Sequence, residues 1–231
     1  MTPHSIARSP TRIPAALARR FGRQLRAWYR ANHRDLPWRR TRDPYEVLVS
    51  ELMLQQTPVA RVVDRYPEFL REFPTLASVA RAEPARVREA WTGLGYYARA
   101  RSLHRIALGI PPGQTLPSDP AELRRLPGIG AYTAGAVASF AHERRAALVD
   151  TNVARVLRRV FAPRIDPVTA KGRRTLWALA EATLPRTGHD CYTHNQALME
   201  LGALICTARV RHCDRCPVRG CCRTAAAERG Q

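Results

Sequence analysis

Proline and glycine divide this chain into short segments, and that division restricts the folds open to it more than any other feature. The breaks fall at Pro37, Pro44, Pro58, Pro67, Pro74, Pro84, Gly93, Gly95, Pro117, Pro120, Pro127 and Pro163. Between the breaks, apolar residues recur at helical spacing, and no alternation of apolar and polar residues is long enough to build a sheet. We therefore predict an all-α fold made of many short helices.

The segments group into two helical domains. We expect residues 39–145 to form a six-helix domain, and residues 13–38 with 146–222 to form a second domain. Residues 1–12 are interpreted as a disordered basic arm and 223–231 as a tail. The arginine-rich N-terminus also resembles a transit peptide. A helix is predicted to follow the arm because apolar residues recur there at helical spacing, namely Leu17, Phe21, Leu25 and Trp28.

The charge of the chain indicates a polyanionic partner. The formal net charge is +19, and nucleic acid is the leading candidate for a chain this basic. All basic side chains except Lys171 and the histidines are arginine, which indicates genomic bias. That bias explains arginine in place of lysine, but not the excess over acidic residues. No apolar run is long enough to span a membrane, so we expect a cytoplasmic protein without a membrane partner.

Four cysteines near the C-terminus have the spacing of a metal centre. Cys206, Cys213, Cys216 and Cys222 follow a C-x6-C-x2-C-x5-C pattern, and thiolates bind zinc or an iron–sulfur cluster. Zinc modules usually pair two tight C-x2-C knuckles, so the single knuckle here favours the cluster. Disulfides are disfavoured because no segment resembles a signal peptide. Cys221 is a rival ligand, whereas Cys191 is interpreted as a core residue.

A glycine-rich turn between two expected helices, 120–126 and 132–141, is typical of a helix-hairpin-helix at about 120–141. Gly128 and Gly130 let the backbone approach a ligand, and free amides of the following helix would face a phosphate. A dinucleotide-binding fingerprint is excluded because no strand precedes the turn and the third glycine is misplaced. A plain helix-to-helix turn is the remaining alternative.

Two carboxylates are candidates for acid–base chemistry. Glu51 shares a helix face with Val47, Leu48 and Leu54, and a buried carboxyl acquires a raised pKa that suits a general acid. A solvent-facing or arginine-paired Glu51 is the alternative. Asp150 precedes an expected helix, where a capping role is the ordinary interpretation. Its other interpretation is a carboxylate that faces a developing cation.

These motifs together resemble the endonuclease III superfamily of base excision DNA glycosylases. The resemblance includes the hairpin, segment 149–153 (Val-Asp-Thr-Asn-Val) and the cysteine pattern. Segments 36–39 (Leu-Pro-Trp-Arg), 50–57 (Ser-Glu-Leu-Met-Leu-Gln-Gln-Thr) and 91–101 (Trp-Thr-Gly-Leu-Gly-Tyr-Tyr-Ala-Arg-Ala-Arg) are closely similar to the MutY-type adenine DNA glycosylases. The similarity covers residues 14–222. It implies a monomeric, bacterial, nucleoid-associated enzyme that acts on double-stranded DNA containing a mispaired or damaged base.

The resemblance implies a role for each catalytic residue. Glu51 would protonate a flipped adenine and then help to activate water. Asp150 would stabilise the oxocarbenium-like sugar, and Asn152 would support the pair by hydrogen bonding. Tyr132 stands where bifunctional relatives have a catalytic lysine, and Lys171, the only lysine, lies far from the hairpin in sequence. Because a Schiff base needs an amine, we expect a monofunctional glycosylase.

The resemblance also implies a DNA cleft between the two domains, specific DNA contacts and a cofactor. Gln56 and Tyr96, with Gln55 beside them, match the region that intercalates around the opposite base. The adenine pocket would be lined by Arg34, Trp38, Arg39, Leu54 and Gln196, although the family usually has glutamate at the last of these positions. The four cysteines would hold a structural cluster of the 4Fe-4S type. Arg209 and Arg211 in the cysteine loop would contact phosphate, or they would simply be solvated.

The similarity stops shortly after Cys222. Typical adenine glycosylases continue into a second domain that recognises 8-oxoguanine, and we expect this chain to lack it. An alternative is a thymine or uracil glycosylase for mismatches with guanine, because segment 38–45 and Tyr132 also resemble those enzymes. A non-catalytic DNA-binding module is a third interpretation, and Glu51 with Asp150 argues against it because phosphate binding gains nothing from acids.

Overall fold

The structure, a computed structural model, describes residues 13–229, and the regular secondary structure in this part of the chain is helical. Among these residues the only β-type pairing is an isolated bridge between Cys206 and Arg211. The prediction of an all-α fold is therefore confirmed. The expected disordered arm, 1–12, lies outside the described residues. No helix in the described part is both long enough and apolar enough to cross a bilayer.

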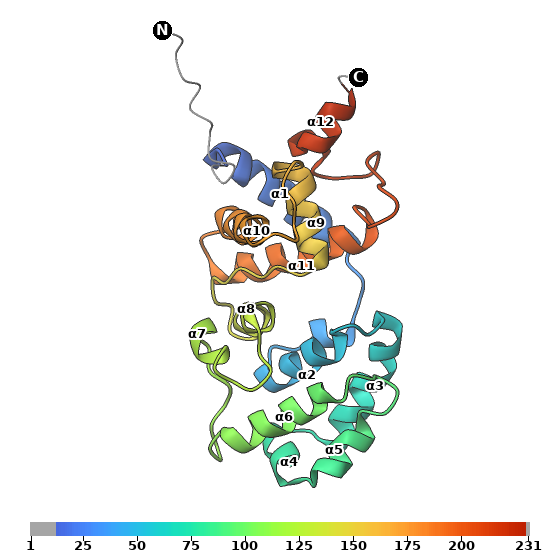
Figure 1. The fold of residues 1–231 in the computed structure, drawn as a ribbon, viewed down its shortest axis with the longest axis vertical. Coiled ribbons are helices and arrows are strands. Elements are labelled where there is room, and N and C mark those ends of the chain that lie inside the picture. Colours follow the sequence, from blue (N-terminus) through green and yellow to red (C-terminus); the bar gives the residue numbers. More distant parts are fainter. Residues whose placement is uncertain (1–12, 230–231) are drawn as a thin grey trace. The chain divides into compact units, whose positions relative to one another are not determined.

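One compact unit comprises Arg34–Ala146. Where six helices were expected for residues 39–145, the structure has seven α-helices, preceded by the short helix η1 (Pro37–Arg39). They are α2 (Pro44–Leu54), α3 (Val59–Glu72), α4 (Leu76–Arg81), α5 (Pro84–Ala90), α6 (Ala98–Gly109), α7 (Pro120–Leu123) and α8 (Ala131–Phe140). Helix α2 lies at the centre and packs against α3, α6 and α8. Figure 1 shows this unit in blue to green, with α4 and α5 beside α6.

The N-terminal end of α2 is fixed by its capping residue. Asp43 accepts hydrogen bonds from the amides of Tyr45 (2.8 Å) and Glu46 (3.1 Å), and Pro44 occupies the first helical position. A capping carboxylate and a first-turn proline both favour helix initiation there. From Val47 to Met53 every residue of α2 is buried. The helix is therefore a rigid central element of the unit.

Pro67 does not end a helix, contrary to its interpretation as a break, because it lies inside α3. A proline in a helix interior removes one hydrogen bond and costs about 3 kcal/mol. Val62, Tyr66 and Phe69 from the same helix are buried, and each buried apolar side chain of this size contributes about 1.5–3 kcal/mol. Burial of one face of α3 therefore offsets the proline.

The other unit combines the N-terminal helix with the C-terminal half of the chain, Met1–His33 with Ala147–Gln231. Its elements are α1 (Ala15–Asn32), α9 (Thr151–Phe161), α10 (Ala170–Thr183), α11 (Gly188–Leu204), η2 (Arg219–Cys221) and α12 (Arg223–Arg229). Helices α1 and α9 both pack against α11 (Figure 1). Phe21 of α1 contacts Phe161 of α9 edge-on, with ring centroids 5.0 Å apart. The segment interpreted as a tail contains α12, which packs against α9.

Candidate functional site

The hairpin has the helix–turn–helix arrangement that its sequence predicts. Helix α7 packs against α8, and Gly128 in the turn has φ +77°. A Cβ at Gly128 would lie 2.4 Å from Ser102 Oγ, so both the backbone conformation and the close approach of α6 require glycine. Gly130 is the N-cap of α8 and has no side chain to cap it. The first amides of α8 can therefore bind an anion.

Glu51 lies near the C-terminal end of α2 and is 3% exposed. Its helix neighbours Ser50 and Leu52 are each 1% exposed, so Glu51 belongs to a fully buried stretch of α2. Burial of a carboxyl disfavours its charged form, which is the condition for a proton donor near neutral pH. The solvent-facing alternative for Glu51 is therefore wrong.

Asp150 and Asn152 are brought together at the start of α9. Asp150 is the N-cap and accepts a hydrogen bond from the Val153 amide at 2.7 Å through Oδ1. Its other oxygen, Oδ2, accepts from Asn152 Nδ2 at 2.9 Å. Burial raises the pKa of Asp150, while the hydrogen bonds from Val153 and Asn152 and the charge of Arg155 lower it. The capping role and a functional role are therefore compatible in one side chain.

Arg155 connects this pair to the cysteine loop. Its Nη2 donates to Asn152 Oδ1 at 2.6 Å and to the Gly202 carbonyl at 2.7 Å. Its Nε donates to the carbonyl of Cys206 at 2.8 Å. The Asn152 amide is consequently bound at both of its polar atoms, which fixes its orientation toward Asp150.

Gly202 allows α11 to cross closely over the start of α9. A Cβ at this position would lie 2.6 Å from Asn152 Cβ and 3.0 Å from the Asn152 carbonyl oxygen. Real Cβ atoms do not approach that closely, so a larger residue would push the two helices apart. The absence of a side chain at Gly202 therefore determines where Asn152 lies.

Gln56 and Tyr96 lie on two turns that touch each other. Both have left-handed backbone conformations, with φ of +56° and +44°, and both side chains are exposed, that of Tyr96 by 61%. Thr57 Oγ1 lies 3.2 Å from the carbonyl oxygen of Leu94, which joins the turns. Gln55 reaches α8 instead, where its Nε2 donates to Thr133 Oγ1 at 3.3 Å.

The expected adenine-pocket residues divide between the two units. In the unit Arg34–Ala146, Trp38 is 7% exposed and packs edge-on against Tyr66, and Arg39 Nη1 donates to the Arg34 carbonyl at 2.9 Å. Leu54, the last residue of α2, is half-buried. Gln196 belongs to α11 in the other unit and is 5% exposed.

Tyr132 and Lys171 occupy the first turns of different helices. Tyr132 is the second residue of α8 and half-buried, and Lys171 is the second residue of α10 and exposed. They belong to different units.

The four predicted cysteine ligands line one cavity that is partly open to solvent. All four are free thiols, and the cavity walls also include the apolar side chains of Val156, Leu201, Ile205 and Val218. Within residues 13–229, however, no three His, Cys, Asp or Glu side chains are placed to hold a single metal ion. The sulfur donor set fits an iron–sulfur group, and the cavity brings its members together without a formed ion site.

The other two cysteines lie apart from the cavity. Cys221 is 6% exposed, and its thiol lies 3.5 Å from Gln24 Oε1 in α1. Cys191 in α11 is completely buried, as expected of a core residue. The guanidinium of Arg159 contacts one of the four predicted cysteine ligands. Its Nη1 donates to Cys206 Sγ at 3.3 Å and to the Thr207 carbonyl at 2.7 Å.

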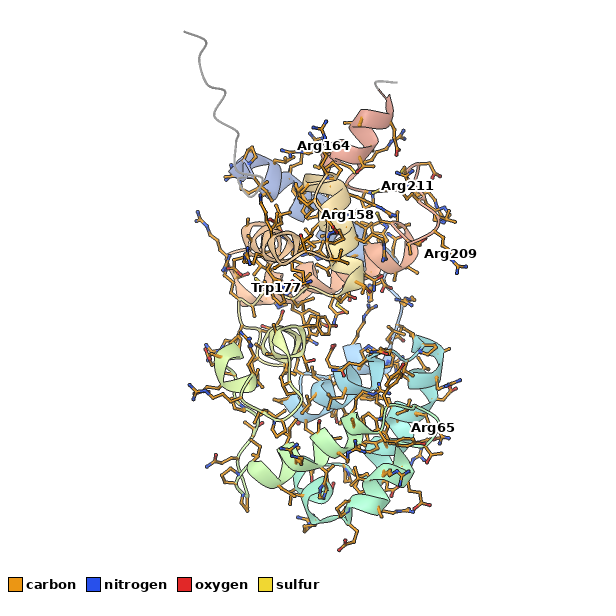
Figure 2. All side chains as sticks on the ribbon, viewed as in Figure 1. Arg65, Arg158, Arg164, Trp177, Arg209 and Arg211 are labelled. Carbon is orange, nitrogen blue, oxygen red and sulfur yellow. The ribbon has the colours of Figure 1, made fainter. Side chains whose placement is uncertain are left out.

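Arg209 and Arg211 project from the loop that follows α11 (Figure 2). Arg209 is exposed, whereas Arg211 forms an ion pair with Glu228 of α12. The two arginines therefore differ in how readily each can meet a phosphate.

Sequence reasoning missed the arginines that hold the site together. Arg99, Arg155 and Arg159 each bind main-chain carbonyls far away in sequence. The only available signal was their position, because Arg155 and Arg159 follow Asn152 at helical spacing and Arg99 lies within the recognised segment 91–101. In a chain this rich in arginine, that signal does not separate a structural arginine from a surface one.

Comparison with known proteins places the chain among DNA repair proteins. Residues 49–182 match the family model described as HhH-GPD superfamily base excision DNA repair protein. The chain is 44% identical over 203 residues to the adenine DNA glycosylase of Mycobacterium tuberculosis (strain CDC 1551 / Oshkosh), which covers 85% of this chain and 65% of that protein. It is 43% identical over 215 residues to the adenine DNA glycosylase of Rattus norvegicus, covering 88% of this chain and 41% of that protein. The chain therefore spans less than two thirds of these relatives.

A solved structure matches over nearly its whole length. It is a thermostable thymine-DNA glycosylase, 28% identical, with a TM-score of 0.82, and the match covers 92% of this chain and 98% of that one. The fold is consequently shared with a thymine-DNA glycosylase, whereas the sequence relatives are adenine DNA glycosylases.

Proposed function

The chain belongs to the HhH-GPD superfamily of base excision DNA repair proteins, and we propose that it is a monofunctional DNA glycosylase that removes adenine mispaired with 8-oxoguanine or guanine. The observation that carries this proposal is the 43–44% identity to adenine DNA glycosylases over 85–88% of the chain. The substrate is double-stranded DNA, in agreement with the net charge of +19. We further propose that the protein acts as a monomer and associates with the bacterial nucleoid.

Glu51 would act as the general acid. It donates a proton to the flipped adenine, so that the bond between the base and C1′ of the sugar breaks with a better leaving group. The resulting carboxylate then accepts a proton from the water that adds to C1′. Its burial in α2 supports this role, because a desolvated carboxyl retains its proton at higher pH than an exposed one.

Asp150 would stabilise the positive charge that develops on the sugar, through its field or through a transient covalent bond. The group must be ionised for either route. Burial raises the pKa of Asp150, and the hydrogen bonds from Val153 and Asn152 oppose that shift by favouring the charged form. Asn152 would keep the carboxylate in place. Fixed charges of this kind act strongly where water is excluded.

Strand cleavage through a Schiff base is not expected. Tyr132 occupies the first turn of α8, and a tyrosine cannot form an imine. The sole lysine, Lys171, is an exposed residue of α10. The glycosylase would therefore leave an abasic site with an intact strand.

Recognition would use three groups of residues. Gly128 and Gly130 would bring the backbone of the hairpin against a phosphate. Gln56 and Tyr96, with Gln55 beside them, would contact the base opposite the adenine. The adenine itself would meet Trp38, Arg34, Arg39, Leu54 and Gln196, and the half-buried positions of Arg34, Arg39 and Leu54 are compatible with a pocket lining.

We propose that Cys206, Cys213, Cys216 and Cys222 hold a 4Fe-4S cluster. Their common cavity and sulfur donor set support this assignment. The cluster would stabilise the fold of the cysteine loop and take no part in hydrolysis. Exposed Arg209, and Arg211 after release from Glu228, would bind phosphate from this loop.

The test is excision from duplexes that each carry one central A:8-oxoG, A:G, T:G or U:G pair, with alkali to reveal abasic sites. We expect excision of adenine by the wild type and loss of excision, with DNA binding retained, in Glu51→Gln. Glu46→Gln is the matched control, because Glu46 lies on the same helix at a half-buried position and should keep full activity.

Excision at T:G or U:G alone would replace adenine with the second candidate, a mismatch thymine or uracil glycosylase. The solved thymine-DNA glycosylase with a TM-score of 0.82 favours that candidate. Tight binding without excision from any duplex would contradict both enzymes.

A further inference from the structure

Two exposed side chains of this protein stand on strained backbone. Gln56 and Tyr96 both have positive φ, a conformation that costs an ordinary L-residue about 1–2 kcal/mol. Both follow the end of an element or a tight turn, and both point a polar or aromatic group into solvent. Strain of this kind persists only where the surroundings hold it in place.

One buried guanidinium provides that hold. Arg99 belongs to α6 and is 7% exposed. On the side of α2, the carbonyls of Leu52 (2.8 Å), Met53 (2.8 Å) and Gln55 (2.5 Å) lie within hydrogen-bonding distance of its Nη1 and share the two N–H groups of that nitrogen. On the side of the other turn, Nη2 donates to the carbonyls of Leu94 (2.9 Å) and Gly95 (2.8 Å), and Nε donates to that of Tyr96 (3.3 Å).

Thr57 completes the connection. Its hydroxyl accepts from both terminal nitrogens of Arg99 at 3.2 Å and lies 3.2 Å from the Leu94 carbonyl. The Arg99 guanidinium also lies over the Tyr96 ring at 5.6 Å and over the buried Trp91 ring at 5.8 Å. Arg99 thus fixes the backbone on either side of Gln56 and also the ring of Tyr96.

The buried guanidinium of Arg99 binds the two turns without a carboxylate partner among the described residues. Within residues 13–229 no carboxylate forms an ion pair with it, and its acceptors are carbonyls and a hydroxyl. A buried charge without a counter-charge is costly. The rigid fork of donors, which a lysine does not possess, can hold both turns in a single arrangement.

We propose that Arg99 is a positioning residue for the choice of opposite base, because it sets Gln56 and Tyr96 at one fixed separation. The inference rests on the proposed function, in which these two side chains contact the base opposite the excised adenine. Guanine and 8-oxoguanine differ by a few atoms, so telling them apart depends on closely fixed contacts. Loosening both turns together should weaken that distinction.

The experiment compares the wild type with Arg99→Met and Arg99→Lys. Single-turnover excision rates on A:8-oxoG and A:G duplexes give the preference for the opposite base. Amide hydrogen exchange of residues 54–58 and 93–97 measures how firmly Arg99 holds the two turns, and it does not require an active enzyme. The matched control is Arg86→Met, because Arg86 is exposed in the same unit and pairs only with Glu72 and Glu89.

In Arg99→Met we expect exchange in the two segments to become ~10-fold faster or more. The rate on the preferred duplex should fall ~10- to 100-fold, with the ratio between the duplexes moving toward one. Arg99→Lys should rescue little of either effect, because an ammonium cannot bridge both turns. Arg86→Met should match the wild type in every measurement.

Several outcomes would overturn the inference. These are equal wild-type rates on both duplexes, an unchanged ratio in a folded Arg99→Met protein, or unchanged exchange in the two segments. If Arg99→Met does not fold, Thr57→Val takes its place, because this variant removes the hydroxyl that bridges the two turns. It should change the ratio of excision rates on the two duplexes and the hydrogen exchange of residues 54–58 and 93–97. If the wild type excises no adenine, the proposed function fails, while exchange still decides whether Arg99 clamps the turns.

Discussion

The side chain of Asn152 is bound at both ends, by Asp150 Oδ2 at 2.9 Å and by Arg155 Nη2 at 2.6 Å. Arg155 also lowers the pKa of Asp150 through its charge. Replacing Arg155 with methionine removes both effects at once. The Asn152 amide loses its fixed orientation, and the carboxyl of Asp150 holds its proton at a higher pH.

We expect Arg155→Met to reduce single-turnover excision ~10- to 100-fold and to move the acid limb of the pH–rate profile to higher pH. The sign follows because Asp150 must be ionised, and raising its pKa extends the range in which it is protonated. Arg158→Met is the control, since Arg158 lies on the same helix with no side-chain hydrogen bond to the site. An acid limb at the wild-type position in Arg155→Met would contradict this account.

At the scale of elements, the crossing of α11 over the start of α9 depends on Gly202. We expect Gly202→Ala to lower the free energy of unfolding by about 1–3 kcal/mol, because the added Cβ must displace Asn152. Excision should fall with it, since Asn152 moves away from Asp150. Thermal melting and single-turnover rates measure the two effects.

Gly109→Ala provides the comparison for this change. Gly109 ends α6, and a Cβ there meets nothing within 4 Å. Alanine favours a helix over glycine by up to about 1 kcal/mol, so this variant should melt at or above the wild-type temperature. Equal melting temperatures for both glycine variants would show that the crossing tolerates a side chain.

At the scale of the whole molecule, one buried histidine should contribute to the pH dependence of the free energy of unfolding. His194 in α11 is 0% exposed, and neither ring nitrogen has a hydrogen-bond partner among residues 13–229. Burial lowers the pKa of His194 to about 3; the charge of Arg26 also lowers it, and Asp190 raises it. In the unfolded chain the pKa returns to about 6.5.

Since the folded pKa is the lower one, the unfolded state binds the proton first. Stability that depends on a neutral His194 is complete above pH 6.5 and is lost as the pH falls from there toward 3. The expected loss is about 1 kcal/mol per pH unit in this range. Denaturant unfolding at pH 7 and pH 5 should therefore show a smaller difference for His194→Met than for the wild type. His189→Met, at an exposed position on the same helix, should keep the wild-type difference.

Features that depend on local sequence could be predicted. The helical spacing of Phe21 and Leu25, the capping position of Asp150 and the burial of Glu51 each follow from residues within one or two turns. The same holds for the hairpin, whose Gly128 has the positive φ expected of a glycine turn. The approach of the four cysteines is also local, because one short stretch of chain contains them.

Features that depend on distant partners could not be predicted. The acceptors of Arg99 lie in two stretches of chain about 40 residues apart, the end of α2 with the turn after it and the turn before α6, and nothing in the segment around Arg99 indicates the first of them. Pro67 was misinterpreted for a related reason, because the burial that offsets its cost comes from the packing of α3. The need for glycine at position 202 likewise could not be predicted, because it comes from contact with a helix far away in sequence.

The left-handed conformations of Gln56 and Tyr96 lower the stability of the folded protein, whereas their side chains serve the proposed recognition of the opposite base. Glycine adopts positive φ without strain, so a glycine at either position would relieve part of the strain in the folded protein. It would also remove a side chain that the proposed chemistry needs. A population of variants selected for thermal resistance alone should accumulate glycine at these two positions, whereas selection for repair of DNA should eliminate it.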